Sequence, residues 1–480
     1  MCIGVDTDWS RSDDEADTIE VISPHTELLI ARIAAAQPAA VDAAVAAARA
    51  AVDHGPWPRT PPQERIAAVR RLAELYGQRR DEMAELISRE IGAPIRFAQR
   101  AQVGLPAMMM SAFCGLAETY PWQDVRTGFF GSDVHLRKDP VGVVAAIVPW
   151  NMPQFLIITK LVPALLAGCA VVVKPAPESP LDALLLAEML GQVGLPDGLV
   201  SVVPGDAALG AHLVSHPGVD KVSFTGSSAA GRAVAAACAG NLTKVSLELG
   251  GKSAAIILDD ADPETVAAGV RAASLSNSGQ ICNALTRIVV PAAREQEFVD
   301  ALAERMSALV VGDPADPATE LGPLVSQRQQ HRVRDYIGIG GHEGARLVVG
   351  GAEQPAGLDT GWYVRPTLFA GADNSMRIAR EEIFGPVLTV IAYRDEDEAI
   401  AIANDSDYGL AGSVWTADPE RGVGIAERVR TGTFGVNQGY TMDPYAPFGG
   451  IKDSGYGREL GREGLESYLD TKSIAVAAGA

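Results

Sequence analysis

The chain has 480 residues, of which 47% are hydrophobic and 21% charged, a composition typical of a soluble globular protein with two or three domains. Its formal net charge of −20 argues against binding to nucleic acids or to anionic lipids, since both need clustered Lys and Arg. The longest apolar run, residues 161–173, is well short of the roughly 20 residues that span a bilayer. The acidic N-terminus does not resemble a signal peptide, and five widely spaced cysteines without a CxxC pair favour a reducing cytoplasm.

In chain order, the first predicted elements are helices, at residues 38–53 and within 62–91. From residue 141 onwards, short apolar runs alternate with stretches of helical spacing. The predicted strands are 141–148, 170–174, 199–203, 221–224 and 244–247, with helices at 155–166 and 181–193. A second series has strands at 254–258, 286–290, 387–391 and 412–415, with helices at 263–274 and 295–310. This alternation predicts an α/β fold with two Rossmann-like parallel-sheet domains that meet near Gly250.

The polar segment 125–138 precedes the first of these strands and belongs to neither series. It is consistent with a protruding hairpin that pairs with another element, and equally with an ordinary surface hairpin.

One segment of the chain is a candidate phosphate-binding loop. No G-x-G-x-x-G follows the strand at 141–148, but residues 222–231 form a strand that enters a helix through Gly226 and Gly231. Such a turn presents backbone N–H groups to a phosphate, although a simple tight turn is an equal alternative. Gly251-Lys252-Ser253 is not the end of a P-loop, because Ser246 stands where a glycine is required and a strand follows.

Cys282 is the strongest candidate for a chemically active residue. Cys169 and Cys238 lie in apolar or Ala-rich stretches, as buried structural thiols do, whereas Cys282 has small and polar neighbours. Glu248, between a strand and two glycines, is a candidate base. No histidine has the neighbourhood of a protease partner, and a pair at i, i+4 lacks a third ligand, so no metal site is predicted.

Six motifs occur in a consistent order along the chain. They are Pro149-Trp150-Asn151, Phe224-Thr225-Gly226-Ser227, the segment from Leu247 to Lys252, Gly279-Gln280-Ile281-Cys282, the segment from Glu381 to Val387, and the segment from Pro447 to Lys452. In these motifs the chain resembles the NAD(P)-dependent aldehyde dehydrogenases, over residues 19–468. The resemblance implies the aldehyde dehydrogenase fold with a small β oligomerisation arm. It implies an NAD-binding domain (1–121 and 140–250), a nucleophile-bearing domain (251–450) and the arm with the C-terminal segment (122–139 and 451–480).

The resemblance also implies roles for the reactive residues. Cys282 attacks the aldehyde carbon, and the side-chain amide of Asn151 with the backbone N–H of Cys282 stabilises the oxyanion. Hydride transfer leaves a thioester, which is hydrolysed by water that Glu248 activates, and burial is expected to raise the pKa of Glu248. Lys160 matches a lysine proposed to relay protons to that glutamate, with a helix-surface lysine as the alternative.

The implied cofactor contacts are Val148, Pro149, Trp150, Lys174, Gly226, Ser227, Gly231, Leu249, Glu382 and Phe384. Lys174 is expected at the adenosine ribose, or else as a solvent-facing lysine at a strand end. The family often has a Glu three residues after that lysine, but here Pro177 occupies the position and Glu178 follows it. No arginine in this loop is available for a 2′-phosphate, so the sequence favours NAD and leaves NADP open.

The same match places Met152, Phe155, Met442 and Phe448 along the aldehyde tunnel, with simple core packing as the alternative. These apolar residues predict an uncharged aliphatic, terpenoid or aromatic aldehyde as the small-molecule substrate. An acyl transfer to coenzyme A is a second hypothesis, which Glu248 disfavours, and a non-catalytic protein of the same fold is a third. The family implies a homodimer or homotetramer, built by pairing the segment 125–138 with a strand near 473–477 of the partner.

Overall fold

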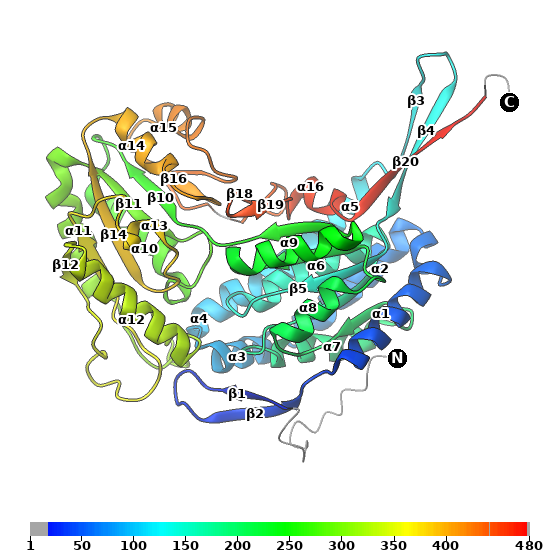
Figure 1. The fold of residues 1–480 in the computed structure, drawn as a ribbon, viewed down its shortest axis with the longest axis horizontal. Coiled ribbons are helices and arrows are strands. Elements are labelled where there is room, and N and C mark those ends of the chain that lie inside the picture. Colours follow the sequence, from blue (N-terminus) through cyan, green and yellow to red (C-terminus); the bar gives the residue numbers. More distant parts are fainter. Residues whose placement is uncertain (1–17, 441, 478–480) are drawn as a thin grey trace.

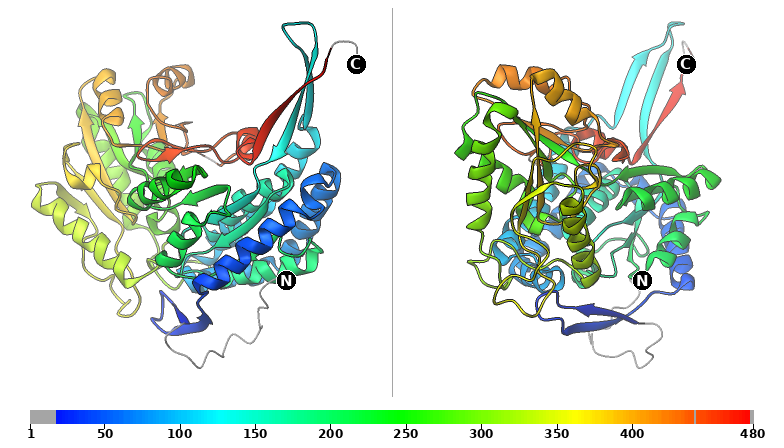
Figure 2. Two further views of the ribbon diagram at one scale, coloured as in Figure 1. Left: turned by 45° about the vertical axis from the view of Figure 1, so that its right-hand side comes forward. Right: turned by 60° about the vertical axis from the view of Figure 1, so that its left-hand side comes forward.

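The computed structural model describes residues 18–440 and 442–477. Two α/β domains lie side by side, and a narrow arm projects beyond them (Figures 1 and 2). The predicted fold class is confirmed, because both domains are built on sheets that are mainly parallel.

The first domain contains a six-stranded sheet with the order β19-β9-β8-β5-β6-β7. Its strands are β5 (Val143–Ile147), β6 (Ala170–Lys174), β7 (Val200–Val202), β8 (Lys221–Thr225), β9 (Lys244–Glu248) and the antiparallel edge strand β19 (Gly455–Tyr456). Strands β5 and β6 are buried throughout and apolar apart from the last residue of β6, as expected for parallel strands covered on both faces.

Helices cover both faces of this sheet (Figure 1). They are α1 (Pro38–Asp53), α2 (Pro62–Gln78), α3 (Arg80–Ile91), α5 (Gly104–Thr119), α6 (Pro153–Ala167), α7 (Leu181–Val193), α8 (Ala207–Ser215) and α9 (Ser228–Asn241). Helix α6 is buried along its whole length and ends at Gly168, whose φ of 101° a side chain would strain. Because α6 begins directly after Met152, it fixes the position of the Pro149–Asn151 motif.

The second domain contains a seven-stranded sheet with the order β12-β13-β14-β11-β10-β16-β17. Its strands are β10 (Ser253–Ile257), β11 (Leu285–Pro291), β12 (Arg346–Val349), β13 (Thr367–Ala370), β14 (Val387–Tyr393), β16 (Gly412–Trp415) and β17 (Gly435–Val436). Its helices are α10 (Pro263–Leu275), α11 (Glu295–Ser307), α12 (Gln327–His342), α13 (Arg377–Arg380), α14 (Glu396–Asn404) and α15 (Pro419–Ala426). Glu248 ends β9 and Ser253 begins β10, so the chain passes from one sheet to the other at the predicted Gly250 junction.

The arm is a three-stranded antiparallel sheet with the order β20-β4-β3. It consists of β3 (Gln123–Thr127), β4 (Asp133–Pro140) and β20 (Leu469–Ala475). Strand β20 pairs with β4 of its own chain, with Ser473 opposite Leu136, and the expected pairing of this hairpin with the partner's C-terminal strand stays a prediction. The two edges of this sheet are β20 and β3, and the five residues of β3 are all exposed.

Several short elements were not predicted. They are the hairpin of β1 (Thr18–Ile22) and β2 (Leu29–Ala34), the pair β15 (Tyr408–Gly409) and β18 (Ile451–Lys452), α4 (Ile95–Phe97), the π-helical turn η3 (Ala98–Gln102), and α16 (Gly461–Glu466). Through β18, β19 and α16, residues 451–466 lie against the two domains rather than in the arm. Among the described helices, none is long and apolar enough to cross a membrane.

Candidate active site

A cavity of about 940 Å³ lies between the two domains and is lined by residues of both. The predicted residues that line it are Pro149, Trp150, Asn151, Met152, Phe155, Gly226, Ser227, Glu248, Leu249, Cys282, Glu382, Phe384, Met442 and Phe448. Val148, Lys160, Lys174 and Gly231 are not among the lining residues. The cavity therefore brings the predicted nucleophile, base and oxyanion donor together, with four predicted residues behind its walls.

Cys282 follows a strained turn. Asn277, Ser278 and Gly279 have φ angles of 52°, 56° and 74°, a run of three left-handed residues within η4 (Ser276–Gly279). Left-handed backbone costs a non-glycine residue about 1–3 kcal/mol, so the surrounding structure must hold this turn. A Cβ on Gly279 would lie 2.3 Å from the carbonyl oxygen of Gly385, which only glycine avoids. The turn thus presents Cys282 to the cavity from a rigid support.

The thiol of Cys282 is partly exposed to the cavity. Burial and the neighbouring carboxylates of Glu382 and Glu248 raise its pKa to about 12. Near neutral pH the sulfur is therefore a neutral thiol, and its activation requires a base or a nearby positive charge.

Asn151 connects the first domain to the loop of the nucleophile. Its Nδ2 donates to the carbonyl of Gln280 at 3.0 Å, two residues before Cys282. The backbone carbonyl of Asn151 accepts from Gln102 Nε2 at 2.8 Å and from Asn277 Nδ2 at 3.0 Å. These buried amides were not predicted, since single Asn and Gln residues leave no pattern in a sequence.

Glu248 is 3% exposed, and neither of its carboxylate oxygens has a hydrogen-bond partner in the part of the chain that the structure describes. Burial and the charge of Glu459 raise its pKa well above the usual range, while Lys160, Arg458 and the nearby N–H of Gly450, which does not reach hydrogen-bond geometry, oppose this shift. A Cβ on Gly449 would lie 2.6 Å from Glu248 Oε1, so the glycine leaves room for the carboxylate. Glu248 is thus an unpaired buried carboxyl group that faces the cavity, as a general base requires.

Lys160 lies behind this carboxyl group and is fully buried, so the alternative of a helix-surface lysine is wrong. Its Nζ donates to Glu459 Oε1 at 2.5 Å and to Thr225 Oγ1 at 2.7 Å. Glu459 lines the cavity together with Glu248. The structure therefore adds Glu459, which was not predicted, to the surroundings of the base.

The N-terminus of α9 opens into the cavity. The Ser227 hydroxyl caps it by accepting from the N–H of Ala230 at 3.3 Å. Gly226, Ser228 and Arg232 also line the cavity, so backbone N–H groups, a hydroxyl and a guanidinium converge there, as at an anion site.

Gly231 also has a packing role. A Cβ at this position would lie 2.6 Å from the side chain of Leu249, so the glycine lets α9 pack closely on the residue that follows the base.

Glu382 is held by the chain that links the two sheets. The N–H of Gly251 donates to its Oε1 at 3.0 Å, and a Cβ on Gly250 would lie 2.4 Å from its Oε2. Burial raises its pKa to about 7, and this amide, Arg332 and Lys252 favour the ionised form.

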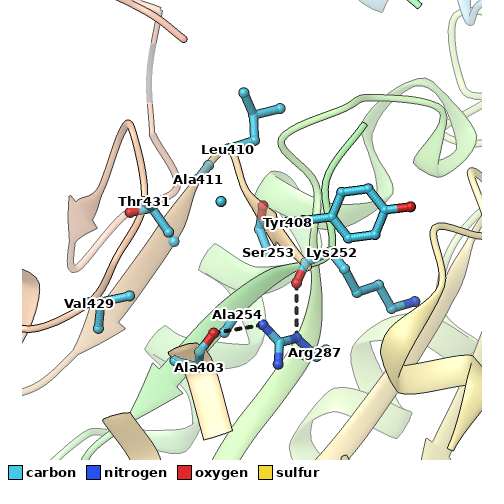
Figure 3. A pocket seen from close by; sticks show the side chains of 12 residues that line it. Lys252, Ser253, Ala254, Arg287, Ala403, Tyr408, Leu410, Ala411, Val429 and Thr431 are labelled. Atoms are coloured by element: carbon cyan, nitrogen blue, oxygen red, sulfur yellow. Dashed lines mark hydrogen bonds between the residues drawn. The ribbon is translucent and has the colours of Figure 1, made fainter. Parts of the chain in front are cut away.

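A small pocket beside this segment shows how the link is anchored (Figure 3). Buried Arg287 donates from Nε to the carbonyl of Lys252 at 2.9 Å and from Nη2 to that of Ala403 at 3.0 Å. Burial and the charge of Arg287 lower the pKa of Lys252 to about 7. Arg287 therefore fixes the backbone that follows Gly250 and Gly251.

Trp150 and Phe384 both line the cavity and contact each other edge to face, with ring centroids 5.5 Å apart. Lys174 is 5% exposed, so it does not face solvent, and its Nζ donates to the carbonyl of Pro175 at 2.8 Å. Nearby, Arg328 on α12 bonds to Glu178 at 3.1 Å. The loop after β6 thus receives an arginine from the other domain, which its own sequence does not contain.

All four predicted tunnel residues line the cavity. The wall also includes Phe97, Ala101 and Leu105 from α4, η3 and α5, and Tyr440, whose ring centroid is 6.0 Å from that of Phe448. A π-helical turn such as η3 frequently marks a functional site, but the sequence contains no signal for it.

Comparison with known proteins identifies the family of the chain. The model of the aldehyde dehydrogenase family matches residues 9–474. The geranial dehydrogenase of Castellaniella defragrans is 48% identical over 95% of this chain and 94% of its own. The aldehyde dehydrogenase of Mycobacterium tuberculosis, solved with NAD+, is 48% identical with a TM-score of 0.95 over 98% of this chain and 97% of its own.

A further solved structure is a variant of aldehyde dehydrogenase C from Pseudomonas syringae with NAD+ and octanal. It is 44% identical, with a TM-score of 0.93 over 98% of this chain and 95% of its own. The six ordered motifs, the two-domain fold and these matches agree, and the chain belongs to the aldehyde dehydrogenase family.

Proposed function

We propose that the protein oxidises uncharged, apolar aldehydes to carboxylic acids with NAD+ and water. The observation that carries this proposal is the convergence of Cys282, Asn151 and the unpaired carboxyl group of Glu248 on one cavity that several apolar side chains also line. The membership of the family supports the reaction class.

In the proposed reaction, the Cys282 sulfur attacks the aldehyde carbon and forms a thiohemiacetal. The negative charge on the former carbonyl oxygen is stabilised by the Asn151 amide and the Cys282 N–H. NAD+ supplies the hydride acceptor, and loss of hydride from the tetrahedral carbon leaves a thioester on the sulfur.

Hydrolysis of that thioester is assigned to Glu248. Its carboxylate would take a proton from an attacking water, for which both oxygens are free of protein partners. Glu459 and Lys160 stand behind it as an ion pair that can pass the proton on. This base disfavours the alternative of acyl transfer to coenzyme A.

The cavity fits a dinucleotide. The N-terminus of α9 with Ser227 and Arg232 suits the pyrophosphate, and Glu382, held by Gly251, suits the hydroxyls of a ribose. Lys174 is assigned to the adenosine ribose.

Glu178 supports NAD+ over NADP+, because its carboxylate repels a 2′-phosphate and occupies the guanidinium of Arg328. Two similar solved structures contain NAD+.

The apolar wall supports the substrate class. Met152, Phe155, Met442 and Phe448 add no charge to the tunnel, and Phe97 and Leu105 extend its apolar surface. One relative is named for geranial and one was solved with octanal, both apolar aldehydes, whereas relatives 43% and 42% identical are named for 3-succinoylsemialdehyde-pyridine and betaine aldehyde.

A panel of aldehydes tests the function. Geranial, octanal, hexanal and succinic semialdehyde are each mixed with NAD+ or NADP+, and NADH or NADPH formation is followed by absorbance, with acyl-CoA assayed in parallel. We expect the apolar aldehydes with NAD+ to give the highest kcat/KM and no acyl-CoA. A higher kcat/KM for succinic semialdehyde than for hexanal contradicts the substrate class, and a tenfold preference for NADP+ contradicts the cofactor.

Assembly is the last part of the proposal. We infer a homodimer or homotetramer in which the arm takes part, because β3 offers a fully exposed edge. Light scattering of the full chain beside a variant with Val125→Pro in β3 tests it, and an unchanged mass for the variant contradicts this use of the edge.

A further inference from the structure

Strands β8 and β9 contain polar residues where the neighbouring strands of the sheet do not. Lys221, Ser223 and Thr225 on β8 and Ser246 and Glu248 on β9 are all less than 9% exposed. A parallel strand that is covered on both faces is normally apolar throughout, as β5 and nearly all of β6 are. Burying five polar side chains in one sheet costs free energy unless they form hydrogen bonds, so their presence here points to a function.

These residues share one face of the sheet, because side chains alternate along a strand. The facing pairs are Thr225 with Glu248, Ser223 with Ser246, and Lys221 with Lys244. Facing strands lie about 4.8 Å apart, and successive pairs about 6.6 Å. A continuous polar row therefore runs from the catalytic end of the sheet to its opposite end, where Lys244 is half-exposed and forms an ion pair with Asp470.

The inner end of the row meets the proposed base. Thr225 accepts from Lys160 Nζ at 2.7 Å, and Lys160 also bonds Glu459 at 2.5 Å. Glu459 and Glu248 both line the cavity. The row thus begins where the proposed reaction delivers its protons.

The middle of the row has its own contacts. The Tyr468 hydroxyl bonds Ser223 Oγ at 3.2 Å, and Lys221 Nζ donates to Ser246 Oγ at 2.7 Å. Lys221 also lies over the Tyr468 ring, 5.2 Å from its centroid. Between these groups and Thr225 the step is about 6.6 Å, a length that one bridging water covers.

The reaction releases two protons in each turnover. One leaves the Cys282 thiol when the sulfur attacks, and the other leaves the water that hydrolyses the thioester through Glu248. The proton of the carboxylic acid returns to the departing thiolate, so aldehyde, NAD+ and water become carboxylate, NADH and two protons. During the chemistry the two substrates would occupy the cavity, which restricts exit on that side.

We propose that the polar row on β8 and β9 carries these protons from the carboxyl groups of Glu248 and Glu459, through Lys160 and Thr225, past Ser223, Tyr468 and Lys221, to solvent at Lys244. The proposal rests on the proposed function. It assigns Lys221 and Tyr468 a task that the oxidation of the aldehyde itself does not use.

The ionisation of the groups around Lys221 agrees with this task. Burial lowers the pKa of Lys221 to about 8; Cys169 and Glu459 oppose this, while Lys244 and Lys160 add to it. An ammonium with such a pKa exchanges a proton near neutral pH. Burial raises the pKa of Tyr468, so that group stays a neutral hydroxyl that both donates and accepts.

The timing of proton release tests the proposal. The full-length enzyme with NAD+ is mixed with octanal in weak buffer that contains a pH indicator, and NADH and protons are followed together through the first turnover. In the wild type we expect protons to appear in step with NADH. In Lys221→Met and Tyr468→Phe we expect NADH to form at the wild-type rate, and proton release to be at least about tenfold slower. Lys452→Met, which removes a half-buried lysine outside the row, is the control and should match the wild type.

The outcomes separate cleanly. A delay in either row variant, with Lys452→Met normal, supports the path. If protons appear in step with NADH in every row variant that folds, the proposed path is wrong. If Lys221→Met does not fold, Tyr468→Phe, which removes a single oxygen, tests the path alone. A wild type that forms no NADH with any aldehyde instead refutes the proposed function.

Discussion

Replacing Glu248 with glutamine separates the two halves of the proposed reaction. The change keeps the shape of the side chain and removes its ability to take a proton. It should be tolerated by the fold, because neither carboxylate oxygen has a hydrogen-bond partner to lose and burial disfavours the charge that glutamine lacks. We therefore expect a Tm at or above that of the wild type.

The size of the effect follows from the role of a general base. Such a group contributes about 10²–10⁴-fold, or roughly 3–5 kcal/mol of barrier, to the step it assists. Hydrolysis of the thioester should slow by this factor. Formation of the thioester should persist, because the charge of Glu248 raises the pKa of Cys282, and its loss makes the thiol easier to ionise.

Stopped-flow absorbance distinguishes the two steps. Glu248→Gln should form about one NADH per active site in a burst and then turn over slowly, with Glu427→Gln, an exposed carboxyl group, as the matched control. A variant that folds and keeps the wild-type steady state would remove Glu248 from the role of base. Loss of the burst with the fold intact would show that Glu248 acts before the thioester forms.

Four further results are expected. Cys282→Ala should form no NADH, and any burst would refute its role as the nucleophile. Asn151→Ala should lower kcat by about 10²–10³-fold, the usual cost of an oxyanion donor, and an unchanged kcat would contradict this. In the wild type, kcat should rise with pH as Glu248 ionises, and Glu248→Gln should abolish that rise. Burial raises the pKa of Asp182 to about 7 beside buried Glu90, so folding binds protons and stability falls as pH rises from about 4 to 7. Tm should then be at least about 2 °C lower at pH 8 than at pH 5.5, and a smaller difference in Asp182→Asn supports this cause, whereas an equal one refutes it.

Much of the fold was predictable because its strongest patterns are local. The helices at 38–53 and 181–193 and the strands at 170–174 and 412–415 were predicted to the residue, since apolar runs and helical periodicity determine their bounds. The short antiparallel strands β18 and β19 were not predicted, because each has two residues and pairs with a strand far away along the chain. The pairing of β20 with β4 of the same chain was missed for the same reason.

The site was predictable where chemistry leaves a motif, as around Cys282 and Glu248. Residues that hold the site from outside the motifs were missed, among them Gln102 and Glu459, because an isolated amide or carboxyl group has many possible roles. The alternation of polar residues on β8 and β9 was visible in the sequence, but it matches a strand with one wet face. Only the burial of both faces shows that the polar row lies inside the protein.

The hydrogen bond between Asn151 and Gln280 explains how an amide can be engaged and still serve the reaction. A primary amide has two N–H donors, and the carbonyl of Gln280 uses one of them at 3.0 Å. The same bond holds the amide plane against the loop of Cys282, which fixes the direction of the second N–H. A donor oriented before the charge develops costs no reorganisation when it does, which is the condition under which such groups contribute most. The loss of kcat expected for Asn151→Ala therefore has two parts. The variant loses the hydrogen bond to the oxyanion, and it loses the hydrogen bond to Gln280 that joins the two domains beside Cys282.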